Sequence, residues 1–275
     1  PDQLPILPVD ALDDPRLADY CGVPDPILLR HRGLFVAESR LVVRELLTHS
    51  RLTTRSLLVT QPALDSLRDL VEGREALPIY VGSPALLKGV IGYAVHRGSM
   101  ALGERPAPRT DLELPTLRES THAVVLEQIG NPDNVGSIFR NAAAFGAGAV
   151  ITTSNCADPL YRKAIRTSLG ATLRLPYAEM PDWPDGLARL ESLGYETVGL
   201  TLDDGAMPLE TFAASAPSRM ALVLGSEGSG ISDRALATVR HRVRIPMAPG
   251  IDSLNVATAS GIALYRLSAR SRDRT

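Results

Sequence analysis

The chain has little cysteine, few aromatic residues and no long apolar run. Its two cysteines, Cys21 and Cys156, lie far apart and lack metal-ligand spacing, which argues against a disulfide framework and against a zinc site. No window approaches about 18 uncharged apolar residues, and neither end carries the pattern of a secretion signal. We therefore expect a soluble, cytoplasmic protein with no metal.

Excess charge is also missing. The net charge of −2 over 275 residues gives no sign of a polyanionic partner. Lys88 and Lys163 are the only lysines, so arginine dominates the positive charge. Arginine suits phosphate contacts and base stacking, although such an excess can equally reflect genome composition. Between residues 26 and 60 the arginines are compatible with one positive face, and they are Arg30, Arg32, Arg40, Arg44, Arg51 and Arg55.

The length favours two domains. Helical and strand patterns alternate up to residue 105, with helices expected at 38–47, 62–71 and 84–90 and strands at 56–59, 78–81 and 99–103. Three prolines then fall within residues 105–115, which no element interior tolerates. The sequence predicts a small α/β domain at 1–105, a linker at 106–118 and a second domain at 119–275.

The second domain shows a clearer alternation. Short apolar runs, typical of strands buried on both faces, occur at 123–127, 149–152, 197–200, 221–224 and 243–245. Helical patterns lie between and after them, at 135–145, 161–169, 184–193, 233–239 and 254–269. Strand and helix in repeated alternation predict an α/β fold, with a mostly parallel sheet and helices on both faces.

Three segments in this domain carry most of the functional information. They span residues 131–140, 224–230 and 245–256, and each begins at or just after a predicted strand. In an open α/β sheet the loops at the carboxyl ends of the strands meet at one crevice. The three segments therefore predict one ligand site, and with it an enzyme.

The first segment combines an amide with an arginine. Asn134 is expected to cap a helix that starts near Val135, and Arg140 follows within two turns. An arginine near a helix start is well placed to bind a phosphate. The alternative is an ordinary surface arginine on an amphipathic helix.

The second segment is rich in glycine but unlike the common nucleotide loops. Its glycines follow the order G-x-x-G-x-G, the reverse of the dinucleotide fingerprint, and no Gly-Lys-Ser/Thr is present. Glu227 would repel a pyrophosphate. A ligand with an amino group or ribose hydroxyls fits better, and a plain glycine turn is the alternative.

The third segment leads into the last predicted helix. Asp252 or Ser253 is expected to cap that helix. Asn255 then falls in the first helical turn, where its amide would be unused unless it bonds a loop or a ligand. Two such loops beside neighbouring strands could clamp a flat ring, which predicts an adenine site without aromatic stacking.

Together the three segments resemble the signature motifs of the SpoU (TrmH-type) RNA ribose 2′-O-methyltransferases of the SPOUT superfamily, over about residues 120–270. The resemblance implies an S-adenosylmethionine-dependent enzyme, a deep trefoil knot and a homodimer. It assigns catalytic roles to Asn134, Arg140, Glu227, Ser253 and Asn255. It implies donor binding at Gly225, Ile245 and Leu254, to which we add Leu224, Gly230 and Met247 from the same loops.

The N-terminal domain resembles the family's L30e-like substrate-binding domain, chiefly at residues 35–40. Arg162, Lys163 and Arg166 on a later helix either extend a phosphate track or are solvated surface charge. We expect Arg140 to bind the phosphate beside the reacting ribose, because a guanidinium is hardly deprotonated in proteins.

The expected substrate is RNA, with ribosomal RNA favoured over transfer RNA. Two other functions stay open at this point. One is a non-catalytic RNA-binding protein with the same knotted fold. The other is a Rossmann-type enzyme with a nucleotide cofactor, which the glycine order disfavours.

Overall fold

The computed structural model describes residues 5–91 and 98–272 and divides into two compact units. The first unit comprises Pro1–Ala107 and Pro159–Arg174, and the second comprises Pro108–Asp158 and Leu175–Thr275. The boundary at residue 107 falls within the predicted linker. Two features differ from the sequence prediction: Pro159–Arg174 packs with the first unit, and the end of the predicted linker is helical, as α5 (Pro115–Glu119).

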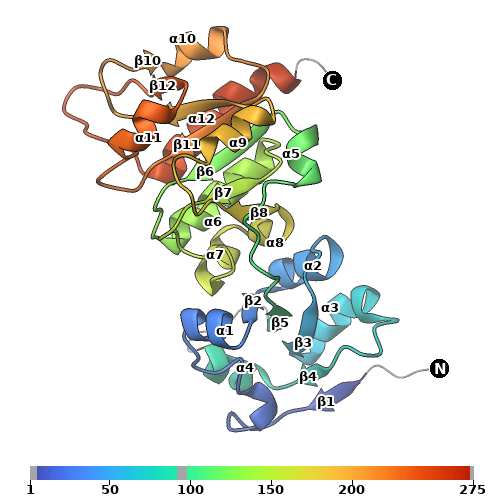
Figure 1. The fold of residues 1–275 in the computed structure, drawn as a ribbon. Helices are drawn as coiled ribbons and strands as arrows, with labels where there is room; N and C mark the ends of the chain where they lie inside the picture. Colours follow the sequence, from blue (N-terminus) through green and yellow to red (C-terminus); the bar gives the residue numbers. More distant parts are fainter. Residues whose placement is uncertain (1–4, 92–97, 273–275) are drawn as a thin grey trace. The chain divides into compact units, whose positions relative to one another are not determined.

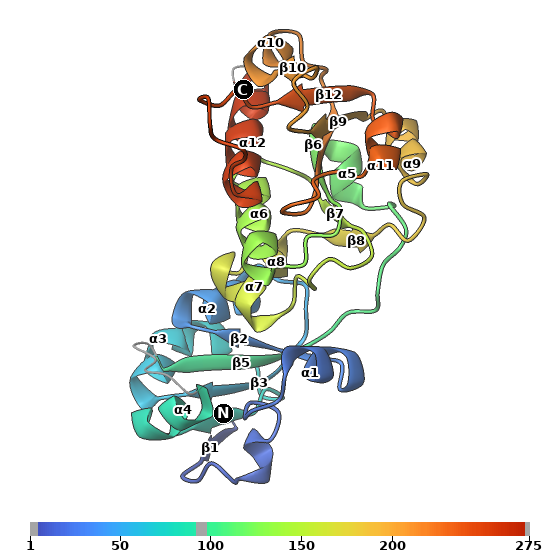
Figure 2. The ribbon, with the colours of Figure 1, turned by 90° about the vertical axis from the view of Figure 1, so that its left-hand side faces the viewer.

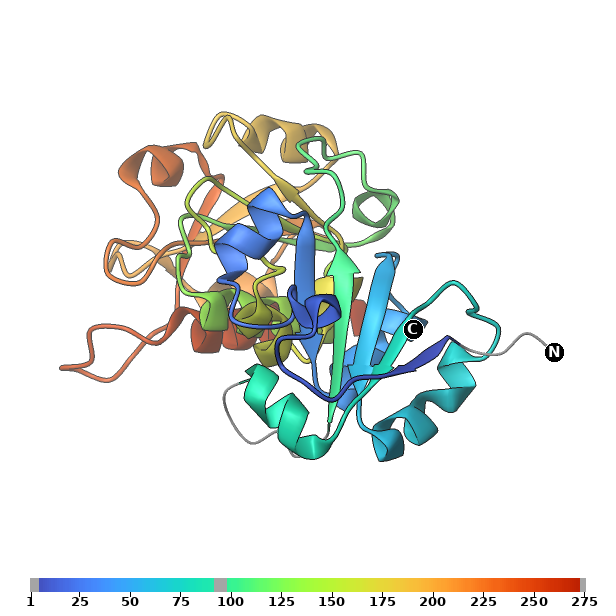
Figure 3. The ribbon, with the colours of Figure 1, turned by 90° about the horizontal axis from the view of Figure 1, so that it is seen from below.

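A five-stranded mixed sheet forms the centre of the first unit (Figure 3). Its strand order is β1 (Ile6–Pro8), β4 (Ile79–Val81), β3 (Thr54–Val59), β5 (Ser99–Glu104) and β2 (Leu34–Glu38), and β5 runs antiparallel to both of its neighbours. The helical elements of this unit are η1 (Pro15–Leu17), α1 (Asp25–His31), α2 (Arg40–Thr48), α3 (Gln61–Val71), α4 (Pro84–Ile91), α7 (Arg162–Thr167) and α8 (Ala171–Arg174).

The helix expected at 38–47 starts two residues later than predicted. Glu38 is the last residue of β2, and Ser39, at a φ of 84°, reverses the chain and accepts a hydrogen bond from the Val42 N–H. The apolar spacing that identified α2 says nothing of its first turn, because a capping residue lies outside the helical repeat.

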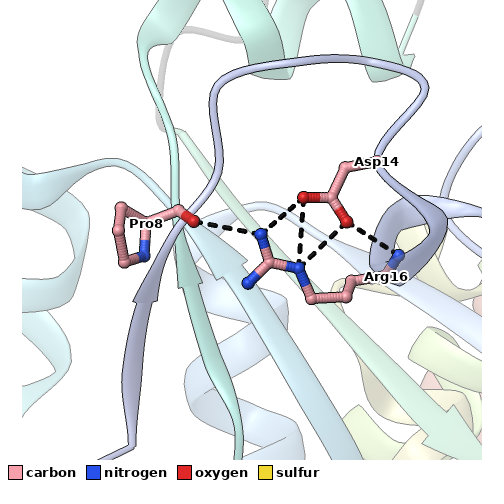
Figure 4. Close-up of polar contacts among 3 residues, drawn as sticks. All are labelled: Pro8, Asp14 and Arg16. Atoms are coloured by element: carbon pink, nitrogen blue, oxygen red, sulfur yellow. Dashed lines mark hydrogen bonds and ion pairs between the residues drawn. The ribbon is translucent and has the colours of Figure 1, made fainter.

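An ion pair secures the turn that follows β1 (Figure 4). Both carboxylate oxygens of Asp14 accept from Arg16 Nε, at 2.9 and 3.1 Å, and Arg16 Nη2 also donates to the Pro8 carbonyl at 3.2 Å. The hydrogen bonds from Arg16 lower the pKa of the Asp14 carboxyl. Arg16 is therefore engaged locally, within the N-terminal turn.

Helix α7 is attached to the first unit by buried charge. Arg162 Nη1 lies 3.1 Å from Oε1 of Glu38, whose side chain is 5% exposed, and the Arg162 N–H donates to Asp25 at 2.7 Å. Arg166 also lies 3.9 Å from Glu38. The charge of Arg162 is thus balanced inside the unit, which removes it from the phosphate track considered above.

The second unit contains a seven-stranded sheet in which every pair is parallel (Figure 1). The order is β10 (Met207–Pro208), β12 (His241–Arg244), β9 (Glu196–Leu200), β11 (Met220–Leu224), β6 (His122–Leu126), β7 (Val150–Thr152) and β8 (Tyr177–Glu179). The five predicted strands are present, and β8 and β10 are additional short strands at the two edges. The predicted α/β class with a parallel sheet is confirmed.

Helices cover both faces of this sheet. Figure 2 shows α6 (Pro132–Ala144) and α12 (Val256–Arg272) side by side on one face, with α5, α9 (Leu187–Ser192) and α11 (Asp233–Thr238) on the other. The remaining helix, α10 (Leu209–Ala214), follows β10. Alternating strand residues such as Val125, Ile151 and Val223 form one buried core with Leu187 and Leu190. This core holds the strand ends, and hence the loops beyond them, in fixed register.

Candidate functional site

The three sequence segments occupy the carboxyl edge of the parallel sheet. Residues 127–131 follow β6, residues 225–232 follow β11, and residues 245–255 follow β12. Strands β6 and β11 are direct neighbours, and β12 lies beyond β9. Their loops therefore meet on one side of the sheet, as the alternation of strands and helices predicts.

Three side chains, one from each segment, form a hydrogen-bonded cluster. Asn134 Nδ2 donates to Glu227 Oε1 at 2.7 Å, and Asn255 Nδ2 donates to the same oxygen at 2.9 Å. Asn255 Nδ2 also donates to Asn134 Oδ1 at 3.0 Å. Asn134 is buried, whereas Glu227 and Asn255 are exposed. We call these residues the amide–carboxylate cluster; it joins the three predicted loops at a surface open to a ligand.

The helix caps differ from those predicted. Asn131, not Asn134, caps α6 by accepting from the Asp133 N–H at 2.9 Å, because Pro132 at the first helical position leaves the next N–H to be satisfied. The amide of Asn134 is therefore available for the cluster.

The cap of the last helix was also wrongly predicted. Neither Asp252 nor Ser253 caps α12. Its first N–H groups, from Ala257 and Thr258, donate to Asn255 Oδ1 at 2.9 and 3.2 Å. Asn255 thus lies just before the helix and not in its first turn. Its side-chain oxygen caps the helix, and its side-chain nitrogen donates to the other two residues of the cluster.

Glycine is required where loop 225–232 folds back on itself. Ser226 and Gly230 exchange two backbone hydrogen bonds, at 3.1 and 2.9 Å, which bring Gly225 against Gly230. A Cβ at Gly225 would lie 2.0 to 2.2 Å from the backbone of Gly230 and Ile231. Gly228 and Gly230 have φ values of +95° and +66°, which favour glycine. Leu224, before this turn, is buried in β11.

The loop after β12 leaves its main chain open. Within residues 247–254, the Ile251 N–H donates to the Ala248 carbonyl at 3.3 Å. No other backbone N–H of this stretch has a backbone partner in the described part of the chain. Ile245 and Met247 are half-buried, Leu254 is 37% exposed, and Ser253 is exposed. Open amides and carbonyls suit a ligand with several hydrogen-bonding atoms on a small frame, such as an adenosine.

Arg140 lies apart from the cluster. It is exposed on α6, and none of the hydrogen bonds or ion pairs among the described residues involves it. Six positions along a helix rotate a side chain by about two thirds of a turn, so Arg140 does not share the face of Asn134. Within the part of the chain that the structure describes, Arg140 is an exposed cation without a hydrogen bond or an ion pair.

Sequence reasoning missed Glu127 and Asn141. Glu127, directly after β6, is 3% exposed and accepts hydrogen bonds from Trp183 and Ser232. Asn141 Nδ2 donates to the Ala257 carbonyl at 2.8 Å and to a side chain of α12, and so joins α6 to α12. An acidic residue immediately after a buried strand was the available signal for Glu127.

The described residues contain neither a candidate metal cluster nor a membrane-spanning helix. No group of three or more His, Cys, Asp or Glu side chains there could hold a metal ion. Among the same residues, no helix combines the length and the apolar character needed to cross a membrane.

Comparison with known proteins places this arrangement in a family. The sequence profile of the SpoU rRNA methylase family matches residues 121–265, which include all three loops of the site. The chain belongs to the SpoU rRNA methylase family.

Two RNA methyltransferases are similar to the chain in sequence. An uncharacterized tRNA/rRNA methyltransferase of Mycobacterium bovis is 40% identical over 271 residues, covering 96% of this chain and 92% of the relative. The 23S rRNA (guanosine-2′-O-)-methyltransferase RlmB of Acinetobacter baylyi is 30% identical over 185 residues, covering 65% of this chain and 73% of that protein. The chain is thus a SpoU-family RNA methyltransferase.

A solved structure shares the fold along nearly the whole chain. The AdoMet-bound rRNA methyltransferase from Sinorhizobium meliloti has a TM-score of 0.80 at 21% identity, covering 97% of this chain and 98% of that one. The likeness therefore extends to the first unit as well as to the methylase region.

Proposed function

We propose that the protein transfers a methyl group from S-adenosylmethionine to a ribose 2′-hydroxyl of structured RNA, with ribosomal RNA the favoured substrate. The observation that carries the proposal is the amide–carboxylate cluster of Asn134, Glu227 and Asn255, because it joins the three family motifs at one exposed point. The relative from Acinetobacter, named as a 23S rRNA 2′-O-methyltransferase, supports both the position methylated and the RNA class.

The loops fit the proposed donor. Gly225 faces a turn with no room for a Cβ, and residues 247–254 leave most of their main-chain groups open. A pocket with such walls accepts the flat adenine and hydrogen-bonds its ring edge through backbone groups. We assign donor binding to Leu224, Gly225, Gly230, Ile245, Met247 and Leu254. When bound, the donor supplies an electrophilic methyl group on a sulfonium sulfur.

The cluster is proposed to orient the reactants. Both amides donate to Glu227 Oε1, so Oε2 of the same carboxylate is available to accept from a ribose hydroxyl or from the donor's ammonium group. The exposed Ser253 hydroxyl is proposed to contact the same ligands. Placing the 2′-oxygen in line with the methyl carbon reduces the entropic part of the barrier.

Arg140 is proposed to provide electrostatic stabilisation. A guanidinium keeps its proton, so it does not act as a base. Bound to the neighbouring phosphate, it lowers the pKa of the 2′-hydroxyl and favours the developing alkoxide. The oxygen–carbon bond then forms as the carbon–sulfur bond breaks, and the hydroxyl proton passes to solvent.

We further propose a homodimer that uses the outer face of α12. Ile262 and Tyr265, three positions apart on one face, are 41% and 58% exposed, and Phe145 packs edge-on to Tyr265 at 5.9 Å. Exposed apolar side chains of this size favour an interface. A second copy on this face would also bring a second Arg140-bearing helix to the site.

The proposed trefoil knot is supported by the path into α12. The chain leaves β12, which is separated from β11 by β9, and returns to pack α12 against α6 and β11. It therefore crosses the loop-bearing ends of the intervening strands.

The N-terminal domain, which we propose spans residues 1–105 and which lies within the first unit, is proposed to bind RNA. Arg32 and Arg44 are paired with Asp19 and Asp69. Between residues 26 and 60, the exposed arginines without such a pair among the described residues are Arg30, Arg40, Arg51 and Arg55, and they would contact phosphates. The cytoplasm is the proposed compartment, since both proposed substrates are present there.

Methyl transfer tests the proposal directly. The purified protein is incubated with S-adenosylmethionine labelled in the methyl group and with unmodified ribosomal or transfer RNA, and 2′-O-methylated nucleotides are mapped. We expect label in ribosomal RNA, confined to a ribose. RNA binding without donor binding would favour a non-catalytic protein. Thermal protection by NAD but not by S-adenosylmethionine would favour a Rossmann-type cofactor site.

A further inference from the structure

Loop 225–232, the proposed donor loop, is fixed at both of its ends by one residue. At the entry, the Glu127 N–H donates to the Leu224 carbonyl at 2.8 Å. At the exit, the Glu127 carboxylate accepts from the Ser232 N–H at 2.9 Å and from the Ser232 hydroxyl at 2.6 Å. The residues between these two points contain Glu227 of the amide–carboxylate cluster.

The same carboxylate holds a second segment. Trp183 Nε1 donates to Glu127 Oε1 at 2.7 Å, and Trp183 belongs to the stretch 180–186 between β8 and α9. The Trp183 ring is partly buried against the core of the second unit. Three strand ends are therefore connected through one side chain, because Glu127 follows β6, Ser232 follows β11, and Trp183 follows β8.

Because the Glu127 side chain is buried, the positions of its hydrogen-bond donors are tightly constrained. The side chain is 3% exposed, and no ion pair within the described residues involves it. A buried carboxylate is tolerated when its oxygens accept hydrogen bonds, and losing one such partner is costly. Each of the three donors is thus held to a narrow position. Ser232 in turn accepts from the Ala235 N–H and so caps α11.

We propose that Glu127 is a positioning residue for the methyl donor, which sets the shape of loop 225–232, and that Trp183 senses occupancy of that loop through the shared carboxylate. The inference rests on the proposed donor site. Trp183 is the only tryptophan of the chain, so all tryptophan emission comes from the residue that makes this contact.

Ligand binding without turnover provides the first test. S-adenosylhomocysteine is titrated into the full chain while tryptophan emission is recorded, and binding is measured in parallel by isothermal titration calorimetry. We expect the emission change to saturate at the calorimetric stoichiometry and Kd. Binding by calorimetry with unchanged emission would overturn the sensing role of Trp183.

Substitution of the carboxylate provides the second test. Glu127→Gln keeps the size of the side chain but replaces one acceptor oxygen by an NH₂ group, which then faces a donor. We expect the Kd for S-adenosylhomocysteine and the KM for S-adenosylmethionine to rise about tenfold or more, equivalent to about 1.4 kcal/mol, with kcat changed less than KM. Trp183→Phe, which removes the indole N–H together with the pyrrole part of the ring, is expected to raise both constants by a smaller factor.

A matched control separates positioning from loss of stability. Glu38→Gln neutralises another buried carboxylate, 5% exposed, which lies in the first unit. It is expected to lower the melting temperature without changing donor affinity. Equal donor affinity in Glu127→Gln and wild type, or an equal rise in both glutamine variants, would overturn the positioning role.

The remaining outcomes are also informative. If Glu127→Gln does not fold, Trp183→Phe measured by calorimetry decides, and unchanged affinity there overturns the proposal. Absence of donor binding in the wild-type protein would instead contradict the proposed function.

Discussion

Asn255 donates to the side-chain oxygen of Asn134 at 3.0 Å across 121 positions of sequence. The orientation of the Asn255 amide is set by its surroundings, because its oxygen accepts from the N–H groups of Ala257 and Thr258, which can only donate. The nitrogen must then face Asn134 and Glu227. A single side chain therefore begins the last helix and completes the site.

These two tasks of Asn255 can be separated. Asn255→Asp keeps the oxygen that caps α12 but loses the amide donors and places a second carboxylate next to Glu227. We expect methyl transfer to fall by about 10²-fold or more with little change in melting temperature. Asn255→Ala also loses the cap, which costs about 0.5–2 kcal/mol of stability. The measurements are kcat/KM and urea unfolding, and an active Asn255→Asp enzyme would contradict the proposed role.

Gly225→Ala is expected to abolish donor binding. Its Cβ would fall 2.0 Å from the Gly230 backbone, so the loop has to open. Gly130→Ala is the control from the neighbouring loop, since the nearest atom to its Cβ is 4.0 Å away. Calorimetry with S-adenosylhomocysteine should detect binding in the control alone, and binding of wild-type strength by Gly225→Ala would refute the assignment.

Arg140→Lys tests the bidentate phosphate contact. The side chain is exposed and makes no hydrogen bond, ion pair or ring contact among the described residues, so the melting temperature should not change. We expect kcat to fall by about 10², because an ammonium binds phosphate as a point charge. Near-wild-type single-turnover rates would show that the phosphate role is wrong.

Ile262→Asp is expected to dissociate the proposed homodimer, because a carboxylate would be buried without a partner in the interface. Light scattering coupled to gel filtration measures the mass. Leu202→Asp, at a position that is 60% exposed, is the control and should stay dimeric. A wild-type protein of monomeric mass would contradict the proposed assembly.

Stability should fall in mild acid because of His122. This residue is 4% exposed, and burial lowers the pKa of its imidazole. In the unfolded chain the His122 imidazole takes up a proton near pH 6.5, whereas in the folded chain it stays neutral at that pH. The free energy of unfolding is therefore highest above this pH and decreases as the pH falls below it. We expect a slope of up to about 1.4 kcal/mol per pH unit below pH 6.5 from this residue. Urea unfolding between pH 5 and 8 should show a flatter dependence in His122→Asn, and an identical slope would exclude His122.

The sequence predicted the architecture of the second unit because buried parallel strands are continuous apolar runs. Strands β8 and β10 were missed, since they have three and two residues at the sheet edges. The cap of α6 was wrongly predicted for a local reason. Asn131 and Asn134 lie near the same helix start. Pro132 occupies the first helical position, so the residue before it, Asn131, is the cap, and the polarity of the two asparagines does not reveal this.

The members of the cluster were predicted individually from the sequence, but their contacts were not. Asn134, Glu227 and Asn255 come from separate loops, and strand order sets which loops meet. Glu127 was missed because its partners Trp183 and Ser232 lie 56 and 105 positions away. No spacing rule connects such residues.

The attachment of α7 and α8 to the first unit has a practical consequence. The chain passes between the two units three times, at residues 107, 158 and 174. A chimera that exchanges only residues 1–107 with those of a relative would leave Arg162 facing foreign carboxylates, or none. Recombination of RNA specificity among such enzymes should therefore transplant residues 159–174 together with the N-terminal part.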